Sequence, residues 1–162
     1  MIENSEQKRR RIMGKQLLPT YINSLNEIST NIISSDTLLS IVETDFFYSQ
    51  IDYEKKAEVK KTILFSERKD VEKILKEHFI DFNEKYILWI KHANDCGALK
   101  LESLNYFNFE FSYNVCKNGV ITFTQIDYKY QILLDFYEEH STKYLDIDIF
   151  YRIKKSPMIG VM

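Results

Sequence analysis

Apolar and polar residues alternate through much of the C-terminal half of the chain, which is the pattern of β-strands. The clearest run has an apolar or aromatic residue at every second position from Phe107 to Val115. It predicts a half-solvated antiparallel strand. The expected strands cover residues 85–92, 98–104, 107–115, 120–127, 130–138 and 144–153. Because residues 128–140 also fit a helical stripe, that segment stays open between strand and helix.

Two turn signals support short connections between these strands. Asn118–Gly119 is the strongest short hairpin signal and predicts a tight turn before residue 120. The polar residues 140–143 predict a second turn.

The N-terminal half instead shows helical spacing. Ile22, Leu25 and Ile32 recur at helical intervals, and Pro19 suits the first turn of a helix. The expected helices cover residues 4–17, 19–33, 53–65 and 67–79. Residues 37–51 fit either a helix or extended structure, and we favour a short helix followed by a loop.

Helices followed by strands predict an α+β fold, with N-terminal helices packed on one face of a C-terminal antiparallel β-meander of about five or six strands. The length of 162 residues fits a single domain. Its expected parts are a basic arm or helix at 1–18, a mainly helical region at 19–80, the sheet at 85–153 and a loose tail at 154–162.

Composition narrows the classes of function. The chain has only four glycines, which argues against the glycine-rich loops that hold phosphates. The N-terminal charges precede no apolar segment, so we expect no signal peptide, and the apolar runs are too short to cross a membrane. Two cysteines in a chain of this size fit a reducing compartment, and we expect a cytoplasmic protein.

Residues that could carry chemistry are sparse. His92, Cys96, Cys116 and His140 are possible zinc ligands, but they lack the paired short spacing of zinc sites. Cys116 could be a nucleophile, yet no surrounding motif indicates an activating base. We therefore expect no metal, no cofactor and no enzymatic activity.

Charge is distributed unevenly along the chain. Residues 17–53 carry five acidic residues and no lysine or arginine. A second acidic group comprises Asp135, Glu138, Glu139, Asp146 and Asp148. Asp146 and Asp148 lie two apart on an expected strand and so share a face. In order of preference, this group is a solvated surface, an acidic patch that recognises a basic partner, or a catalytic site.

Basic residues gather in the two helices expected over 53–79. They are Lys55, Lys56, Lys60, Lys61, Arg68, Lys69, Lys73 and Lys76. A helix–turn–helix regulator that binds nucleic acid is the first alternative function. Interleaved acidic residues in the same segment nearly cancel this charge, which is typical of a solvated helix surface.

In overall character the chain resembles the immunity proteins of bacterial polymorphic-toxin and contact-dependent growth inhibition systems. The resemblance covers the whole chain and rests on the acidic 17–53 block, the 135–148 carboxylates and the lack of a catalytic signature. It implies specific binding to a cognate toxin domain, often a basic nuclease. A small enzyme or ligand-binding domain with a pocket between sheet and helices is the second alternative.

Acidic residues and nearby aromatic residues are the candidate contacts with such a partner, because aromatic side chains supply binding hot spots. The expected partner-binding residues are Asp45, Phe46, Phe47, Tyr48, Asp52, Asp135, Tyr137, Glu138, Glu139, Asp146 and Asp148.

Overall fold

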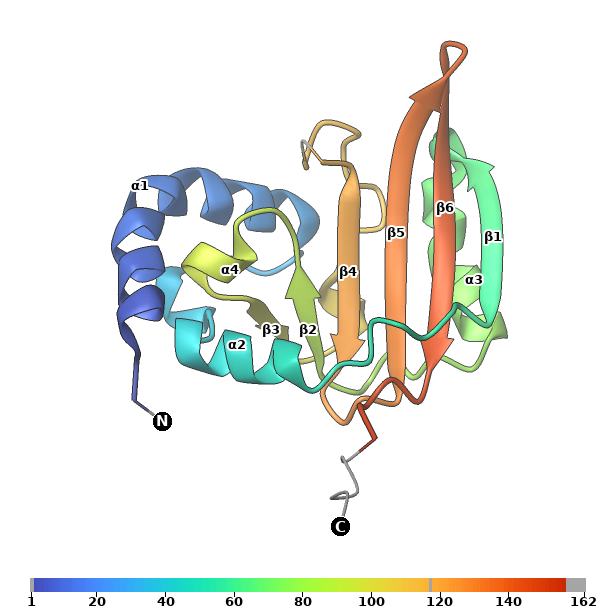
Figure 1. Cartoon of the computed structure of the whole chain (residues 1–162). Coiled ribbons are helices and arrows are strands. Elements are labelled where there is room, and N and C mark those ends of the chain that lie inside the picture. The colour runs from blue at the N-terminus through green and yellow to red at the C-terminus, as the bar shows by residue number, and fades with distance from the viewer. Residues whose placement is uncertain (1, 117, 157–162) are drawn as a thin grey trace.

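The computed structural model describes residues 2–116 and 118–156 and shows an α+β fold, as predicted. Its six strands form one antiparallel sheet in the order β1-β6-β5-β4-β2-β3 (Figure 1). The strands are β1 (Val59–Leu64), β2 (Tyr86–Trp89), β3 (Leu99–Leu101), β4 (Val120–Gln125), β5 (Tyr130–Glu139) and β6 (Thr142–Tyr151). The α-helices are α1 (Ser5–Ile28), α2 (Ile41–Ser49), α3 (Val71–Glu77) and α4 (Ala93–Cys96). 3-10 helices occur at η1 (Ser35–Thr37), η2 (Phe65–Asp70) and η3 (Leu104–Tyr106).

The hairpin of β5 and β6 is the longest pair in the sheet, and its tip extends beyond the neighbouring strands (Figure 1). His140 and Ser141 form its two-residue turn, with φ angles of 51° and 65°. Positive φ at both turn residues matches the twist of the two strands. The segment 128–140, which the sequence left open, is therefore mostly strand β5.

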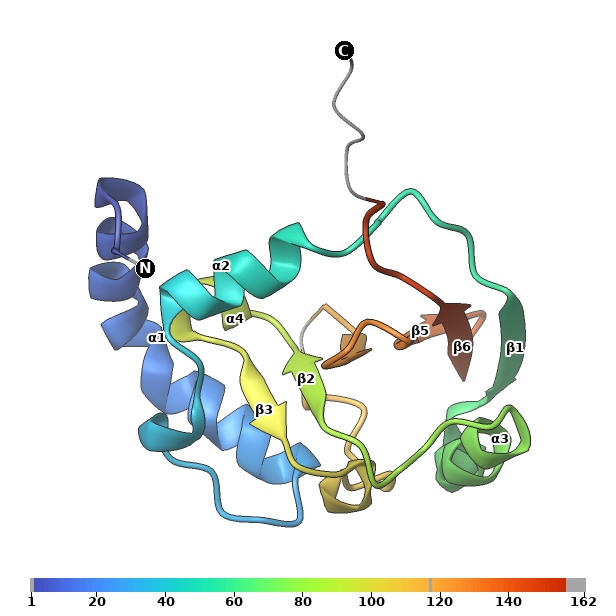
Figure 2. The ribbon, with the colours of Figure 1, turned by 90° about the horizontal axis from the view of Figure 1, so that it is seen from below.

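One face of the sheet carries the core. Ile132, Leu134 and Phe136 of β5 point to this face and are at most 3% exposed. The Phe136 ring lies 5.6 Å from that of Phe65 and 5.3 Å from that of Phe111. Figure 2 shows α3 on this side of the sheet, while α2 and the segment that follows it lie on the other. The side chains of β5 that alternate with the core residues, Leu133, Asp135 and Tyr137, are only partly buried on that other side.

Helix α1 is a single helix where two were predicted, at 4–17 and 19–33. Asn4 and Gln7 form a reciprocal capping box at its start, and Pro19 lies inside it. Gly14 allows close approach of α4, since a Cβ at this position would lie 2.1 Å from the carbonyl oxygen of Asp95. Tertiary contact at Gly14 thus outweighs its low helix propensity.

The helix predicted over 53–65 is wrong. Residues 59–64 form β1, an edge strand that pairs with β6. Val59 and Ile63 are half-buried on the core face. The alternation of apolar and polar residues over 59–64 therefore fits the observed strand better than the helical spacing on which the prediction was based. Backbone pairing also covers the edge of β6 that would otherwise be open. The next predicted helix, 67–79, is split between η2 and α3.

The strand predicted over 107–115 is also wrong, although its alternation is real. Phe107, Phe109 and Phe111 are buried, but the segment forms turns and joins no strand ladder beyond a single bridge at Phe107. Arg68 instead donates to the carbonyl oxygen of Phe111 at 2.6 Å. In the described residues, no strand precedes the hairpin predicted at Asn118–Gly119, and Gly119 (φ 66°) leads from a turn into β4.

Residues 37–51 contain α2, as the favoured interpretation predicted, but the helix includes the aromatic residues expected in a loop. Ser40 and Glu43 cap its start reciprocally. In the part of the chain that the structure describes, no helix has the length and apolar character needed to cross a membrane.

Candidate protein interface on the open face of the sheet

The side chains of β5 and β6 that point away from the core form a row of acidic, aromatic and apolar groups. Strand register places Asp135 opposite Asp146, Leu133 opposite Asp148 and Tyr137 opposite Tyr144. We call this surface, together with its neighbours on β4 and β1, the open face. Its members are Lys60, Thr62, Val120, Thr122, Gln131, Leu133, Asp135, Tyr137, Tyr144, Asp146, Asp148 and Phe150.

Three carboxylates lie at the centre of the open face. Partial burial is the main cause that raises the pKa of Asp135, and the charges of Asp146 and Asp148 raise it further. Burial likewise raises the pKa of Asp148, while Lys60 opposes the shift and Asp146 adds to it. Asp135 and Asp146 are directly opposite each other in the ladder, an arrangement that disfavours folding when both are charged.

Asp146 is held in place by two hydroxyl groups. Thr62 of β1 donates to its Oδ1 at 2.7 Å, and Tyr137 of β5 donates to the same oxygen at 3.1 Å. These bonds fix the carboxylate without neutralising its charge.

Basic residues do not neutralise this group. Among the described residues, no ion pair within 4.0 Å includes Asp135, Asp146 or Asp148. Lys60 faces Asp148 across the β1–β6 ladder but forms no such pair. The fold therefore retains like charges at a cost to its own stability, which is typical of surfaces selected for function.

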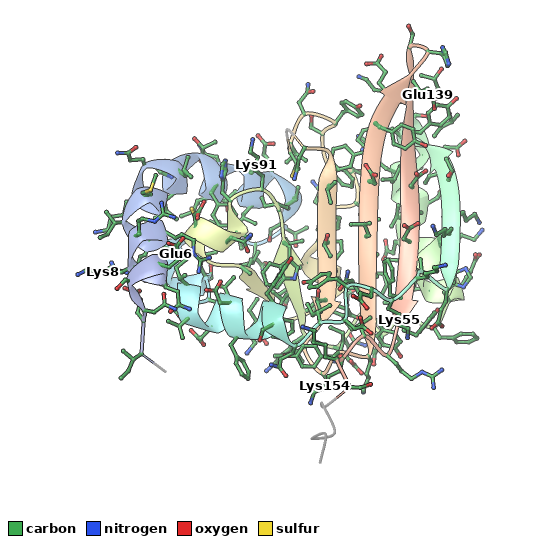
Figure 3. The ribbon with its side chains drawn as sticks, in the orientation of Figure 1. Glu6, Lys8, Lys55, Lys91, Glu139 and Lys154 are labelled. Atoms are coloured by element: carbon green, nitrogen blue, oxygen red, sulfur yellow. The ribbon has the colours of Figure 1, made fainter. Side chains whose placement is uncertain are left out.

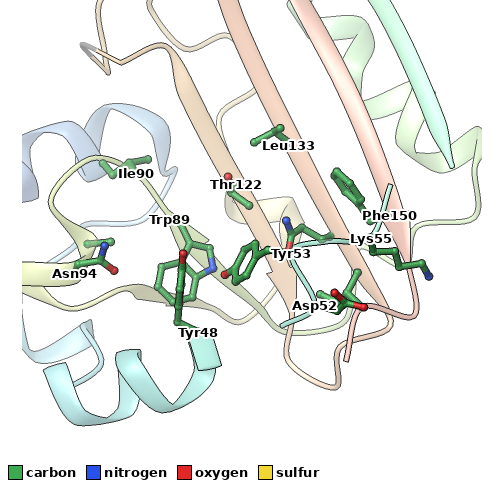
Figure 4. Close-up of a pocket in the computed structure, with 13 residues that line it drawn as sticks. Tyr48, Asp52, Tyr53, Lys55, Trp89, Ile90, Asn94, Thr122, Leu133 and Phe150 are labelled. Atoms are coloured by element: carbon green, nitrogen blue, oxygen red, sulfur yellow. The ribbon is translucent and has the colours of Figure 1, made fainter. Parts of the chain in front are cut away.

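Aromatic residues flank the carboxylates at both ends. Tyr137 and Tyr144 lie towards the hairpin tip with ring centroids 5.7 Å apart. At the other end, the ring centroid of Tyr48 lies 4.6 Å from that of Tyr53 and 5.9 Å from that of Trp89. These three rings border a cavity of about 360 Å³ (Figure 4). The open face thus combines charge at its centre with aromatic surface at its ends.

Four of the residues proposed from the sequence come together here. Asp135, Tyr137, Asp146 and Asp148 share the open face. Glu139 lies on the same side at the hairpin tip, and Figure 3 shows it there. Glu138 points to the opposite side of the same strand.

Two further predicted residues lie at the lower end of the open face. Tyr48 and Asp52 both line the cavity. The Oδ1 atom of Asp52 also accepts a hydrogen bond from the backbone N–H of Glu54 at 3.1 Å, which shapes the segment that crosses the sheet.

The three remaining predicted residues lie elsewhere on α2. Asp45 pairs with Arg10 and accepts a hydrogen bond from Gln7 Nε2 at 2.9 Å. Burial alone would raise the pKa of Asp45, but these bonds hold it below its usual value. Phe47 is buried and stacks on Tyr128 with centroids 4.8 Å apart. Asp45 and Phe47 thus join elements of the scaffold.

Phe46, also on α2, is 52% exposed, and its ring contacts no other aromatic ring among the described residues. It lies outside the set that borders the cavity. Exposure leaves it available to a partner, but it is separate from the open face.

Sequence reasoning missed Tyr53, Trp89, Gln131 and Tyr144. Tyr144 and Gln131 follow from extending the period of two from Asp146 and Asp135. Tyr53 had no such signal, because its segment was predicted to be helical. Its position depends on the crossing of residues 50–58 over the sheet, which is a tertiary feature (Figure 2).

The candidate metal and thiol chemistry finds no support in the described residues. They contain no group of three or more His, Cys, Asp or Glu side chains placed to hold a metal ion. Burial raises the pKa of Cys96 to about 11 and that of Cys116 to about 12. Both thiols are therefore protonated near neutral pH and are poor nucleophiles.

The helix–turn–helix alternative required two consecutive helices over residues 53–79, and the structure does not have the first of them. Lys60 and Lys61 lie on an edge strand rather than on the first of two helices. On α3, Lys76 pairs with Glu72 at 3.1 Å and Lys73 with Glu77 at 4.0 Å. The basic residues are thus spread over a loop, the strand β1, the 3-10 helix η2 and the helix α3, whose charges balance.

Comparisons of the chain with protein-family models, with curated proteins and with solved structures found no match in any of the three. The geometry of the open face is therefore the basis for proposing a function.

Proposed function

We propose that this chain is a non-enzymatic immunity protein that binds and neutralises a cognate toxin domain with a basic surface. The observation that carries the proposal is a group of three carboxylates, Asp135, Asp146 and Asp148, that form no ion pair with any described residue and lie on the partly exposed side of β5 and β6. Their mutual repulsion disfavours the free protein and is relieved when a positive surface covers them.

The electrostatics of this face favour rapid capture of a basic partner. A cluster of like charges steers oppositely charged proteins and raises association rates, most strongly at low salt. An immunity protein benefits from such steering because it must bind its toxin before the toxin reaches its target.

Aromatic rings would supply the affinity that charge alone does not. Tyr137 and Tyr144 present half-buried rings beside the carboxylates. Tyrosine side chains lose little conformational entropy on binding and are enriched in binding hot spots. Because both stand on paired strands, the sheet holds them in place before the partner arrives.

The first experiment identifies the partner and tests its activity. The tagged chain is used to capture proteins from a lysate of its source cells, and stoichiometric partners are identified by mass spectrometry. Each is then expressed alone in a host that lacks this chain. The proposal predicts that one captured protein, with a basic surface, arrests growth and that co-expression of this chain restores it.

Charge variants then test the surface. Asp146→Asn combined with Asp148→Asn removes two charges while keeping side-chain size. We expect the association rate with the captured toxin to fall by about tenfold at low salt, in the range of electrostatic steering. The matched control, Asp36→Asn with Glu67→Gln, removes two exposed charges outside the open face and should leave the rate nearly unchanged. A captured partner that is harmless when expressed alone would contradict the proposal.

A further inference from the structure

The cavity at the lower end of the open face is lined by a residue with a buried polar atom that has no hydrogen-bond partner among the described residues. Gln131 of β5 lines it and is only 8% exposed. Its Oε1 atom is fully buried and accepts no hydrogen bond from the described residues. Such an unmet acceptor lowers stability in the free protein, because burial removes water without supplying a donor.

Three aromatic rings surround the same cavity. Tyr48 and Trp89 meet edge to face at 73°, and Tyr53 packs beside Tyr48 at 4.6 Å. Figure 4 shows the three rings grouped beside the sheet, with Leu133 and Phe150 farther along its strands. Aromatic faces attract cations through their negative quadrupole.

The charges around the cavity also favour a cation. Asp52 lines its rim, and Asp148 is the register partner of the lining residue Leu133. The one lysine among the lining residues, Lys55, is engaged by Glu58 at 3.2 Å and by the carbonyl oxygen of Arg152 at 3.2 Å. Its charge is thus directed to the protein's own acceptors.

We infer that this cavity receives the guanidinium group of an arginine side chain from the basic partner. The inference deepens the proposed function and rests on it for the source of the arginine. Guanidinium is planar, stacks on aromatic rings, carries five N–H donors and is less strongly hydrated than the ammonium group of lysine. Its plane can therefore lie against the rings while its charge faces Asp52, and it can donate to Gln131 Oε1 once the amide turns from its buried position towards the cavity.

The cavity contains its own reporter, because Trp89 is the only tryptophan in the chain. The probe is N-acetyl-arginine amide, titrated into the purified full-length chain at constant ionic strength while tryptophan fluorescence is recorded. N-acetyl-citrulline amide has a similar planar end without charge, and N-acetyl-lysine amide has charge without the plane. We expect a saturable change with the arginine probe, a weaker one with lysine and none with citrulline.

Variants at Gln131 separate the cavity from general charge effects. Gln131→Met keeps the length of the side chain without its polar atoms, and arginine affinity should fall about tenfold, the scale of a hydrogen bond to a charged group. Gln131→Glu should strengthen binding of the same probe. Gln50→Met, outside the cavity, is the matched control and should bind as the wild type does.

An equal response to citrulline, or arginine binding that Gln131→Met leaves unchanged, would overturn the inference. So would the absence of any fluorescence response to arginine. The proposed function is tested separately, because capture of a partner and its toxicity when expressed alone do not depend on this cavity probe.

Discussion

Neighbouring residues of β5 point to two faces of the sheet that differ in what covers them. Leu134 lies in the core at 0% exposure, whereas Leu133 beside it lines an open cavity. On the core face, β5 carries only apolar, buried side chains between residues 132 and 136: Ile132, Leu134 and Phe136. On the open face, the same strand carries a buried amide oxygen that accepts no hydrogen bond from the described residues, and a carboxylate opposite another carboxylate.

The side chains on the core face stabilise the fold, whereas several on the open face do not. Burial of apolar surface explains the core face, since each fully buried aliphatic side chain stabilises the protein by roughly 1.5–3 kcal/mol. No comparable gain explains Asp135 opposite Asp146 or the buried Oε1 of Gln131. Features that disfavour folding are better explained by a partner that completes them.

The largest expected effect comes from truncating the two adjacent leucines. Leu134→Ala should lower the free energy of unfolding by about 2–5 kcal/mol, because it leaves a cavity in the packed core. Leu133→Ala should cost only about 1 kcal/mol, since water can enter the space. Urea denaturation of both variants measures the contrast, and equal losses would show that the open face is packed as tightly as the core.

Two buried glutamines give a second contrast between the faces. Gln125 points into the core, where its Oε1 accepts from the backbone N–H groups of Asp127 at 2.8 Å and Lys129 at 3.1 Å. Gln125→Met should therefore destabilise the protein by about 1–3 kcal/mol. Gln131→Met removes an acceptor that has no donor and should raise stability by roughly 1 kcal/mol.

Thermal and urea unfolding of the two methionine variants provide the measurement. A loss of stability in Gln125→Met together with a gain in Gln131→Met would support the view that the open face holds groups that bind a partner. A loss of stability in both variants would mean that Gln131 is satisfied within the fold.

The smallest expected effect concerns Asp135 and pH. Its folded-state pKa lies above the ordinary value of 3.8, so its ionised form disfavours folding at neutral pH. Asp135→Asn should raise the free energy of unfolding at pH 7 by a few tenths of a kcal/mol, a small value because water screens the group. The advantage should shrink as pH falls through the raised pKa towards 3.8, where the wild-type carboxyl becomes protonated in both states.

Urea midpoints of wild type and Asp135→Asn across this range check the sign. Asp36→Asn, at an exposed site outside the open face, is the control and should change stability little at any pH. An advantage of Asp135→Asn that grows as the solution is acidified would contradict the assigned cause.

The sequence predicted the central strands because their alternation and their burial coincide. It placed Asp146 and Asp148 on one face for the same reason, since a period of two fixes sides without knowledge of tertiary structure. Asp135 and Tyr137 join them through the register of β5 with β6, which the sequence did not predict. It failed at β1, where lysines on an edge strand imitate the mixed surface of a helix. It also failed at residues 107–115, where alternating aromatic residues cover the core without pairing as a strand.

The cavity could not be predicted from the pattern of residues along the chain. It joins Tyr48 from α2, Tyr53 from a crossing segment and Trp89 from β2, three segments whose meeting depends on the complete fold. Nor does sequence reveal that Gln131 lacks a donor while Gln125 has two.

The central claim is that the open face is the surface that meets a basic toxin. The most direct test places the photo-crosslinking residue p-benzoyl-phenylalanine at Tyr144 on the open face and, as a control, at Tyr106. Tyr106 is 39% exposed and lies in η3, within the segment that covers the core face. After irradiation in the source cells, we expect Tyr144→p-benzoyl-phenylalanine to link the chain to one basic protein that is toxic when expressed alone, and the Tyr106 variant to leave it unlinked. A toxin that crosslinks from position 106 and not from 144 would contradict the claim.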